Sequence, residues 1–110
     1  MTTILIRKTS KKEYKGFTCM GHAGFARRNQ PDILCSAISV LVTNTINSLT
    51  ELAGEKVGLV TNEETGFIKC DFEGTLNEKS IFLLDSMVFG LETLSHDYGT
   101  KYLQVKFEEV

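Results

Sequence analysis

The residue pair with the clearest chemical potential is His22 and Cys35, which lie thirteen positions apart in the sequence. A cysteine with an ordinary pKa of about 8.5 is only a few per cent thiolate at neutral pH, whereas a helix N-terminus or a nearby imidazolium lowers that pKa to roughly 3.5 to 7.5. A histidine beside such a thiol can accept its proton and later protonate a leaving group. The pair therefore predicts nucleophilic catalysis by a thiol with a histidine base.

The residues before Cys35 predict a helix start that would favour a thiolate. Pro31-Asp32 is a typical helix opening, because an Asp at the N-cap accepts hydrogen bonds from the amides of the first turn. Cys35 is then the third helical residue, close to the positive end of the helix dipole. The backbone N–H groups of Cys35 and Ser36 become candidate donors to an oxyanion.

The segment before the pair predicts how His22 is presented. Residues 17–22 read as a strand in which His22 shares a face with Thr18 and Met20. Twelve residues, 23–34, then separate His22 from Cys35 and are long enough to bring the two side chains together. The competing interpretation is that Cys35 is a small buried hydrophobe, as free cysteines usually are.

Two sequence blocks resemble the ribosomal-processing cysteine protease family of bacteria: residues 21–26 (GHAGFA) and 32–41 (DILCSAISVL). The similarity extends over the whole chain in length and order of elements, and its specific part lies within residues 21–41. It implies that His22 and Cys35 form a catalytic dyad. It also implies that the site is supported by Gly21, Asp32 and Ser39.

The same resemblance implies a substrate and an oligomeric state. Family members remove an N-terminal extension from a protein of the large ribosomal subunit, so the N-terminal segment of such a precursor is the expected partner. Cleavage is expected after an apolar stretch that contains phenylalanine and before a small residue. Members form homodimers, and we expect the same here.

The chain departs from the family pattern between the two blocks. This loop is about one residue longer than in the family, and residues 27–31 (RRNQP) replace a stretch that is often more acidic or contains glycine. Arg27 and Arg28 are either solvated loop charges or a clamp on the substrate, and Phe25 is a candidate apolar anchor for a lid.

Several candidate residues keep two interpretations at this level. Asp32 can cap the helix or orient the His22 imidazole, and capping is favoured. Ser39 lies one turn after Cys35, so its hydroxyl can reach the site or bond a preceding carbonyl. Gly21 either packs closely beside His22 or allows substrate backbone to pass.

Composition limits the other classes of function. The chain has 110 residues, 42% of them hydrophobic, which fits one compact domain over residues 1–110. The family resemblance implies that this single domain is a cysteine protease domain. A net charge of −2 gives no reason to expect direct nucleic-acid binding. The three cysteines, Cys19, Cys35 and Cys70, are an odd number without CxxC spacing, so we expect no disulfide framework, metal or other cofactor. No signal peptide is expected, and no segment is expected to approach the length of about 20 apolar residues that a membrane span needs, so the predicted location is cytoplasmic.

Hydrophobic periodicity predicts the fold that would hold the pair. Strands are expected at Thr3 to Lys8, Tyr14 to His22, Val57 to Thr61, Phe67 to Glu73 and from Leu103 to Phe107. A first helix is expected from Asp32 to a stop at Gly54, with an apolar stripe that ends at Leu52. A second helix is expected from an Asn77 cap to Tyr98-Gly99, with an apolar stripe of Ile81, Leu84, Val88 and Leu91. The order β-β-α-β-β-α-β predicts an α+β two-layer sandwich, a mostly antiparallel sheet covered by two helices.

Two other functions compete with proteolysis. A noncatalytic ribosome-assembly or peptide-binding module could keep the same fold and hold a peptide in the same groove. A thiol redox sensor would also use an exposed thiol with a lowered pKa. Cys19 and Cys70, which lie in strand patterns, are expected in the core, and His96 is expected to complement the C-terminal dipole of the second helix.

Overall fold

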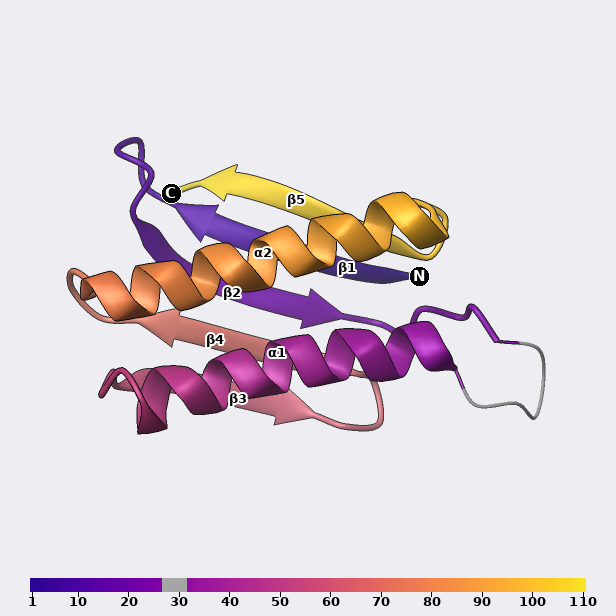
Figure 1. The fold of residues 1–110 in the computed structure, drawn as a ribbon, viewed down its shortest axis with the longest axis horizontal. Coiled ribbons are helices and arrows are strands. Elements are labelled where there is room, and N and C mark those ends of the chain that lie inside the picture. Colours follow the sequence, from indigo (N-terminus) through magenta and orange to yellow (C-terminus); the bar gives the residue numbers. More distant parts are fainter. Residues whose placement is uncertain (27–31) are drawn as a thin grey trace.

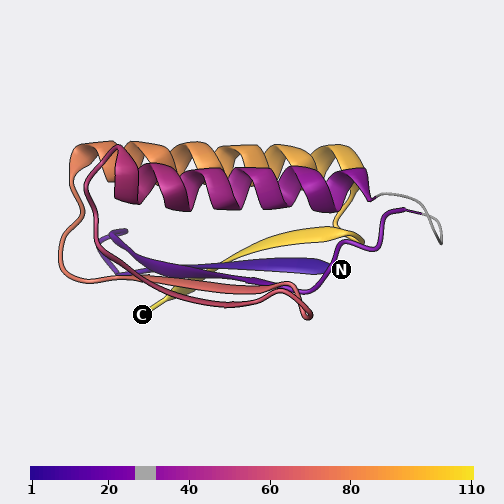
Figure 2. The same ribbon diagram turned by 90° about the horizontal axis from the view of Figure 1, so that it is seen from below.

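The computed structural model of this protein describes residues 1–26 and 32–110. Its elements are, in chain order, β1 (Thr2–Lys8), β2 (Tyr14–Met20), α1 (Ile33–Glu51), β3 (Val57–Asn62), β4 (Phe67–Phe72), α2 (Glu78–Tyr98) and β5 (Leu103–Glu109). Both helices lie over the same face of one sheet (Figures 1 and 2). The predicted α+β two-layer sandwich and its order of elements are confirmed.

The sheet has the strand order β3-β4-β2-β1-β5. The β1–β2, β2–β4 and β3–β4 pairs are antiparallel, whereas β5 pairs with β1 in parallel. The parallel pair arises because α2 carries the chain across the sheet from β4 to the opposite edge (Figure 1). The sheet is therefore mixed and mostly antiparallel, as predicted.

Helix α1 begins where Asp32 predicts it, because the Asp32 carboxylate accepts a hydrogen bond from the Cys35 N–H. Its buried side chains recur at helical spacing and face the sheet: Leu34, Ile38, Val42, Thr45, Ile46, Ser48 and Leu49. Leu52 was expected to continue this stripe, but α1 ends at Glu51 and Leu52 is exposed.

The apolar composition of α1 corrects one expectation. Within the described residues, this helix is long and apolar enough to cross a membrane by length and composition alone, so the prediction that no segment has that character is wrong. Such evidence is weak, because the core helix of a folded domain meets the same criteria. The buried face of α1 on the sheet accounts for its composition.

Helix α2 is capped by Asn77, whose side chain accepts a hydrogen bond from the Ser80 N–H, and it ends at the predicted Gly99. Leu84, Val88 and Leu91 are buried as predicted, whereas Ile81 is 39% exposed. Helix α2 packs against both α1 and β5, so the two helices together cover the sheet.

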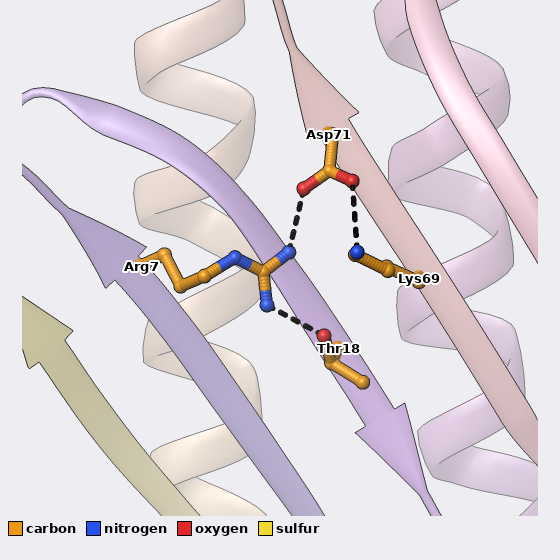
Figure 3. A network of polar contacts seen from close by, with 4 residues as sticks. All are labelled: Arg7, Thr18, Lys69 and Asp71. Atoms are coloured by element: carbon orange, nitrogen blue, oxygen red, sulfur yellow. Dashed lines mark hydrogen bonds and ion pairs between the residues drawn. The ribbon is translucent and has the colours of Figure 1, made fainter. Parts of the chain in front are cut away.

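The open face of the sheet carries a polar network that joins three strands (Figure 3). The Arg7 guanidinium donates to Thr18 Oγ1 at 2.6 Å and to Asp71 Oδ1 at 2.7 Å, and Lys69 Nζ lies 3.7 Å from Asp71 Oδ2. Gly16 lies beneath this network, where an added Cβ would be 2.5 Å from Asp71 Oδ1. A glycine at that position lets the Arg7 and Asp71 side chains meet over β2.

Strand β2 ends earlier than the sequence suggests. Its last residue is Met20, and Gly21 has a φ of +84°, which takes the chain out of the extended conformation. His22 therefore lies beyond the strand, and the expected shared face with Thr18 and Met20 is wrong. This break puts His22 just after β2, and the end of β2 lies next to the start of α1 (Figure 1).

Candidate active site

Cys35 occupies the first turn of α1. Its N–H donates to Asp32 Oδ1 at 2.9 Å, and the Ser36 N–H donates to the Asp32 carbonyl oxygen at 3.0 Å. The cap fixes the orientation of the turn that carries the Cys35 side chain, which is partly exposed. Both N–H groups that were expected to form an oxyanion hole are thus engaged within the cap, and that prediction does not hold in this structure.

His22 faces Cys35 across the intervening loop. Its Nδ1 lies 3.9 Å from Cys35 Sγ, so the structure brings the predicted pair together. The other ring nitrogen, Nε2, lies 3.4 Å from the carbonyl oxygen of Glu64 in the turn between β3 and β4. Both contacts are at the long end of the hydrogen-bonding range, as is common for catalytic groups before substrate binds.

Gly21 is required by the backbone path that presents His22. An added Cβ would lie 2.5 Å from the carbonyl oxygen of Met1, and φ is +84°. Both observations favour the close-packing interpretation of Gly21. The residue lets the chain turn away from β1 directly before the histidine.

Asp32 is fully engaged by backbone donors. One carboxylate oxygen accepts from the Cys35 N–H and the other from the Phe25 N–H, each at 2.9 Å. Partial desolvation raises the pKa of the Asp32 carboxyl, but these bonds and those from Ala26 and Leu34 outweigh it and hold the pKa below its usual value. The geometry favours capping over orientation of His22, and it adds a second role, holding residues 25 and 26 beside the helix start.

Phe25 anchors the start of the loop on the far side of Asp32. Its ring packs edge-on against Tyr98 and Tyr102, with centroids 5.0 and 5.2 Å away. This aromatic cluster joins the loop to the end of α2 and the approach to β5. Contact with substrate stays a prediction for Phe25, and Arg27 and Arg28 lie outside the described residues.

A cavity of about 340 Å³ opens beside the pair. Its apolar wall includes Ile38 and Val42 of α1 and Phe67 and Ile68 of β4. Ser39 also lines it, and its exposed side chain lies one turn along α1 from Cys35. The cavity therefore joins the predicted reactive groups to an apolar surface on which a side chain of a peptide could rest.

The other two cysteines differ from Cys35 in environment. Burial, together with the nearby Cys35 thiol, raises the pKa of Cys19 to about 11. Burial and the neighbouring Asp71 raise the pKa of Cys70 to about 12. Both are core thiols as predicted, although Cys19 also borders the cavity. No cluster of three or more potential metal ligands occurs among residues 1–26 and 32–110.

The β3–β4 turn contributes residues that sequence reasoning did not connect with the site. The Glu64 carbonyl faces His22, and Gly66 lies so close that an added Cβ would be 2.6 Å from the Gly21 carbonyl oxygen and 3.0 Å from His22 Cε1. Asn62 through Gly66 reads as a hairpin turn in the sequence. A backbone carbonyl has no sequence signature, so only the pairing of β2 with β4 reveals this contact.

A thiol at a capped helix start, an imidazole facing it and an adjoining apolar cavity define a cysteine hydrolase. The family model described as cysteine protease Prp matches residues 1–104, and the chain belongs to this family. It is accordingly a cysteine protease, as predicted.

Individual relatives agree with the family assignment. The chain is 30% identical over 102 residues to the ribosomal processing cysteine protease Prp of Bacillus subtilis, covering 89% of this chain and 90% of that protein. Its fold is similar to that of the Prp protease from S. aureus with a covalently linked product peptide, at a TM-score of 0.90 and 19% identity over 98% of this chain and all of that one. A Streptococcus mutans protein is also similar, at a TM-score of 0.85 and 24% identity over all of this chain and 96% of that one.

Proposed function

We propose that this protease removes the N-terminal extension of a large-subunit ribosomal protein precursor, with Cys35 as nucleophile and His22 as general base and acid. The observation that carries the assignment of roles is the 3.9 Å approach of His22 Nδ1 to Cys35 Sγ at the mouth of the cavity. The substrate class follows from the relative in Bacillus subtilis, whose name describes ribosomal processing.

The chemistry proceeds in two stages. His22 Nδ1 takes the thiol proton, and the Cys35 sulfur attacks the scissile carbonyl carbon while the carbonyl π electrons move to oxygen. Collapse of the tetrahedral intermediate breaks the C–N bond, and the imidazolium protonates the leaving amine to leave a thioester. A water that gives its proton to His22 then attacks the thioester carbonyl carbon. Collapse of this second tetrahedral intermediate breaks the C–S bond and releases the carboxylic acid product, and the imidazolium returns a proton to the Cys35 sulfur.

Ser39 is the proposed donor to the developing oxyanion. The N–H groups of Cys35 and Ser36 are engaged by Asp32, whereas the exposed Ser39 side chain borders the same cavity one turn away. A hydroxyl on a rigid helix next to the nucleophile can bond a charge that forms in the transition state.

The apolar wall of the cavity supports recognition of an apolar segment before the cleaved bond. Ile38 and Val42 come from α1, and Phe67 and Ile68 come from β4. An aromatic side chain of the precursor would bury its surface there, which is the usual source of affinity in such clefts.

The decisive experiment is cleavage of a synthetic precursor peptide, followed by mass spectrometry. Wild-type protein should yield two products, while Cys35→Ser and His22→Ala should yield none above background under the same conditions. Circular dichroism should show that both variants stay folded. Undiminished cleavage by Cys35→Ser would exclude the assigned nucleophile, and no cleavage by wild type would favour a noncatalytic peptide-binding module.

We also propose that the protein acts as a homodimer in the cytoplasm. Reduced Cys35 is required for nucleophilic attack, and thiols persist in that compartment. Exposed apolar side chains gather on the outer side of the helix layer, where a groove between α1 and α2 is lined by Ile33, Val40 and Phe89 among others. Contiguous apolar surface of this kind is typical of a protein interface, and a second copy is the occupant that we propose.

A further inference from the structure

The β3–β4 turn meets His22 on the side away from Cys35. His22 Nδ1 faces Cys35 Sγ at 3.9 Å, and Nε2 faces the Glu64 carbonyl oxygen at 3.4 Å. A carbonyl oxygen can only accept a hydrogen bond, so it selects the imidazole form that carries a proton on Nε2. In the neutral ring, Nδ1 is then unprotonated and able to take the thiol proton.

The turn is itself held in shape by its own side chains. Asn62 Oδ1 accepts the Glu64 N–H at 3.1 Å, and the Asn62 carbonyl accepts from Thr65 Oγ1 at 3.4 Å. Such Asx turns fix the direction of the peptide that follows the asparagine. The Glu64 carbonyl is therefore oriented by a local structure and not only by its contact with His22.

Gly66 brings this turn against the histidine segment. Gly66 has a φ of +67°. An added Cβ would lie 2.6 Å from the Gly21 carbonyl oxygen and 3.0 Å from His22 Cε1, so there is no room for a side chain. Gly74 has nearly the same backbone conformation, with φ of +66°, but open space around its Cβ position. Both positions favour glycine because φ is positive, but only at Gly66 would a side chain also clash with neighbouring atoms. A comparison of the two positions therefore isolates the effect of the clash.

We propose that the β3–β4 turn is the positioning element of the dyad, in which the Glu64 carbonyl holds Nε2–H of His22 and Gly66 permits that approach. This role rests on the proposed function of His22 and Cys35. It assigns to a backbone group the task that a carboxylate or amide side chain performs in many triads. Asp32 is not required for that task, because backbone N–H groups engage both its carboxylate oxygens.

The first test compares Gly66→Ala with Gly74→Ala in peptide cleavage. Both changes place an alanine at a positive φ, but only the first forces Gly21 and His22 to move. We expect Gly66→Ala to lower kcat on the order of 10²-fold relative to Gly74→Ala, with KM changed much less, since small displacements of reacting groups have effects of that size. Equal kcat values in the two folded variants would overturn the positioning role.

The second test weakens the carbonyl without adding atoms. Cys35 and Cys70 allow chemical synthesis of the whole chain by ligation of three segments, 1–34, 35–69 and 70–110, with the Glu64–Thr65 amide replaced by an ester. An ester carbonyl is a poorer acceptor, so alkylation of Cys35 by iodoacetamide at pH 7 should be about fivefold slower than in the synthetic all-amide protein. The same ester in a His22→Ala background should change the rate little, because the effect acts through the imidazole.

An ester effect of the same size with and without His22 would overturn the proposal. A pair of Asn62 variants tests the shape of the turn. Asn62→Asp keeps the acceptor for the Glu64 N–H and should retain most of kcat, whereas Asn62→Ala removes that acceptor and should lower kcat. The outcomes also separate this inference from the proposed function. Loss of cleavage in His22→Ala alongside full activity of Gly66→Ala rejects only the positioning role, whereas full cleavage by His22→Ala rejects the dyad itself.

Discussion

At the scale of single residues, the three cysteines differ in burial, so that one thiol is reactive and two are core thiols. Cys35 is partly exposed at a helix start, whereas burial raises the pKa of Cys19 to about 11 and that of Cys70 to about 12. A thiol with a pKa of 11 is only about one part in a thousand ionised at pH 8, since each pH unit changes the ratio tenfold. Reactivity is therefore confined to the residue that faces His22.

Brief treatment of the native protein with iodoacetamide at pH 7.5 should label Cys35 first. Thiolate is the reacting form, and both buried thiols are neutral and shielded at that pH. A peptide map after proteolysis measures the order of labelling, and Cys35→Ser protein shows whether the remaining thiols react once Cys35 is absent. Equal labelling of all three cysteines in folded protein would contradict the assignment.

Asp32 should make stability depend on pH in a defined direction. Its pKa is lower in the folded protein than the ordinary value of about 3.9, so its contribution is present above that value and is lost as pH falls through the folded pKa. Asp32→Ala should cost about 1 kcal/mol at pH 7. Asp32→Asn should cost less at pH 7 and should flatten the loss of stability between pH 5 and 3.

Urea unfolding of the Asp32 variants at several pH values measures this effect. Glu73→Gln, which changes an exposed carboxylate in the loop before α2, is the matched control. An unchanged pH profile in Asp32→Asn would mean that the backbone bonds contribute little. If Asp32→Asn instead lost activity by orders of magnitude at unchanged stability, the interpretation of Asp32 as a cap and loop tether would be wrong.

How far the site could be predicted differs from residue to residue. Asp32, three positions before Cys35, is a local signal for a helix N-cap, and the structure confirms Asp32 as the N-cap of α1. The sequence places the end of β2 too late because its strand pattern continues to His22. The close approach of Gly21 to the Met1 carbonyl, which leaves no room for a side chain, depends on pairing with a distant residue. The Glu64 carbonyl could not be found at all, because every residue has one.

At the scale of elements, each part of the site is set by a different piece of secondary structure. α1 supplies Cys35 and Ser39, the exit from β2 supplies His22, and the β3–β4 turn supplies the Glu64 carbonyl. The polar network of Arg7, Thr18 and Asp71 ties β1, β2 and β4 together on the opposite face (Figure 3). The relative position of β2 and β4 therefore fixes how His22 meets the turn.

Gly16→Ala should destabilise the protein by about 1 to 3 kcal/mol, the usual cost of overpacking. The new Cβ would lie 2.5 Å from Asp71 Oδ1 and 2.7 Å from the Cys70 carbonyl oxygen, and the backbone contact cannot be relieved by a side-chain rotation. Gly58→Ala is the matched control within a strand, because its nearest contact would be 3.9 Å. Urea unfolding should place Gly16→Ala well below Gly58→Ala, and equal midpoints would contradict the packing argument.

At the scale of the whole molecule, the two layers leave different surfaces exposed. The two helices form one layer and the sheet forms the other (Figure 2). The outer face of the sheet carries the charged network, whereas the outer side of the helix layer carries large apolar side chains. Phe89 is 75% exposed and Val40 is 67% exposed, and both line the groove between the helices. Periodicity predicts which helix faces are buried against the sheet, but it does not explain apolar residues on the opposite side.

The proposed second copy on this groove would account for those residues, and the oligomeric state tests that proposal. The wild-type chain should sediment as a dimer at micromolar concentration, and Phe89→Gln should shift it toward the monomer, because removal of an aromatic side chain from an interface centre is among the most costly changes. Phe107→Gln on β5 is the control, since Phe107 is also exposed, at 53%, but lies on the edge strand of the sheet. A monomeric wild type, or equal behaviour of the two variants, would reject this interface. Cleavage measured on the same samples would then show whether the dyad works without a partner, as the distance between His22 and Cys35 within one chain leads us to expect.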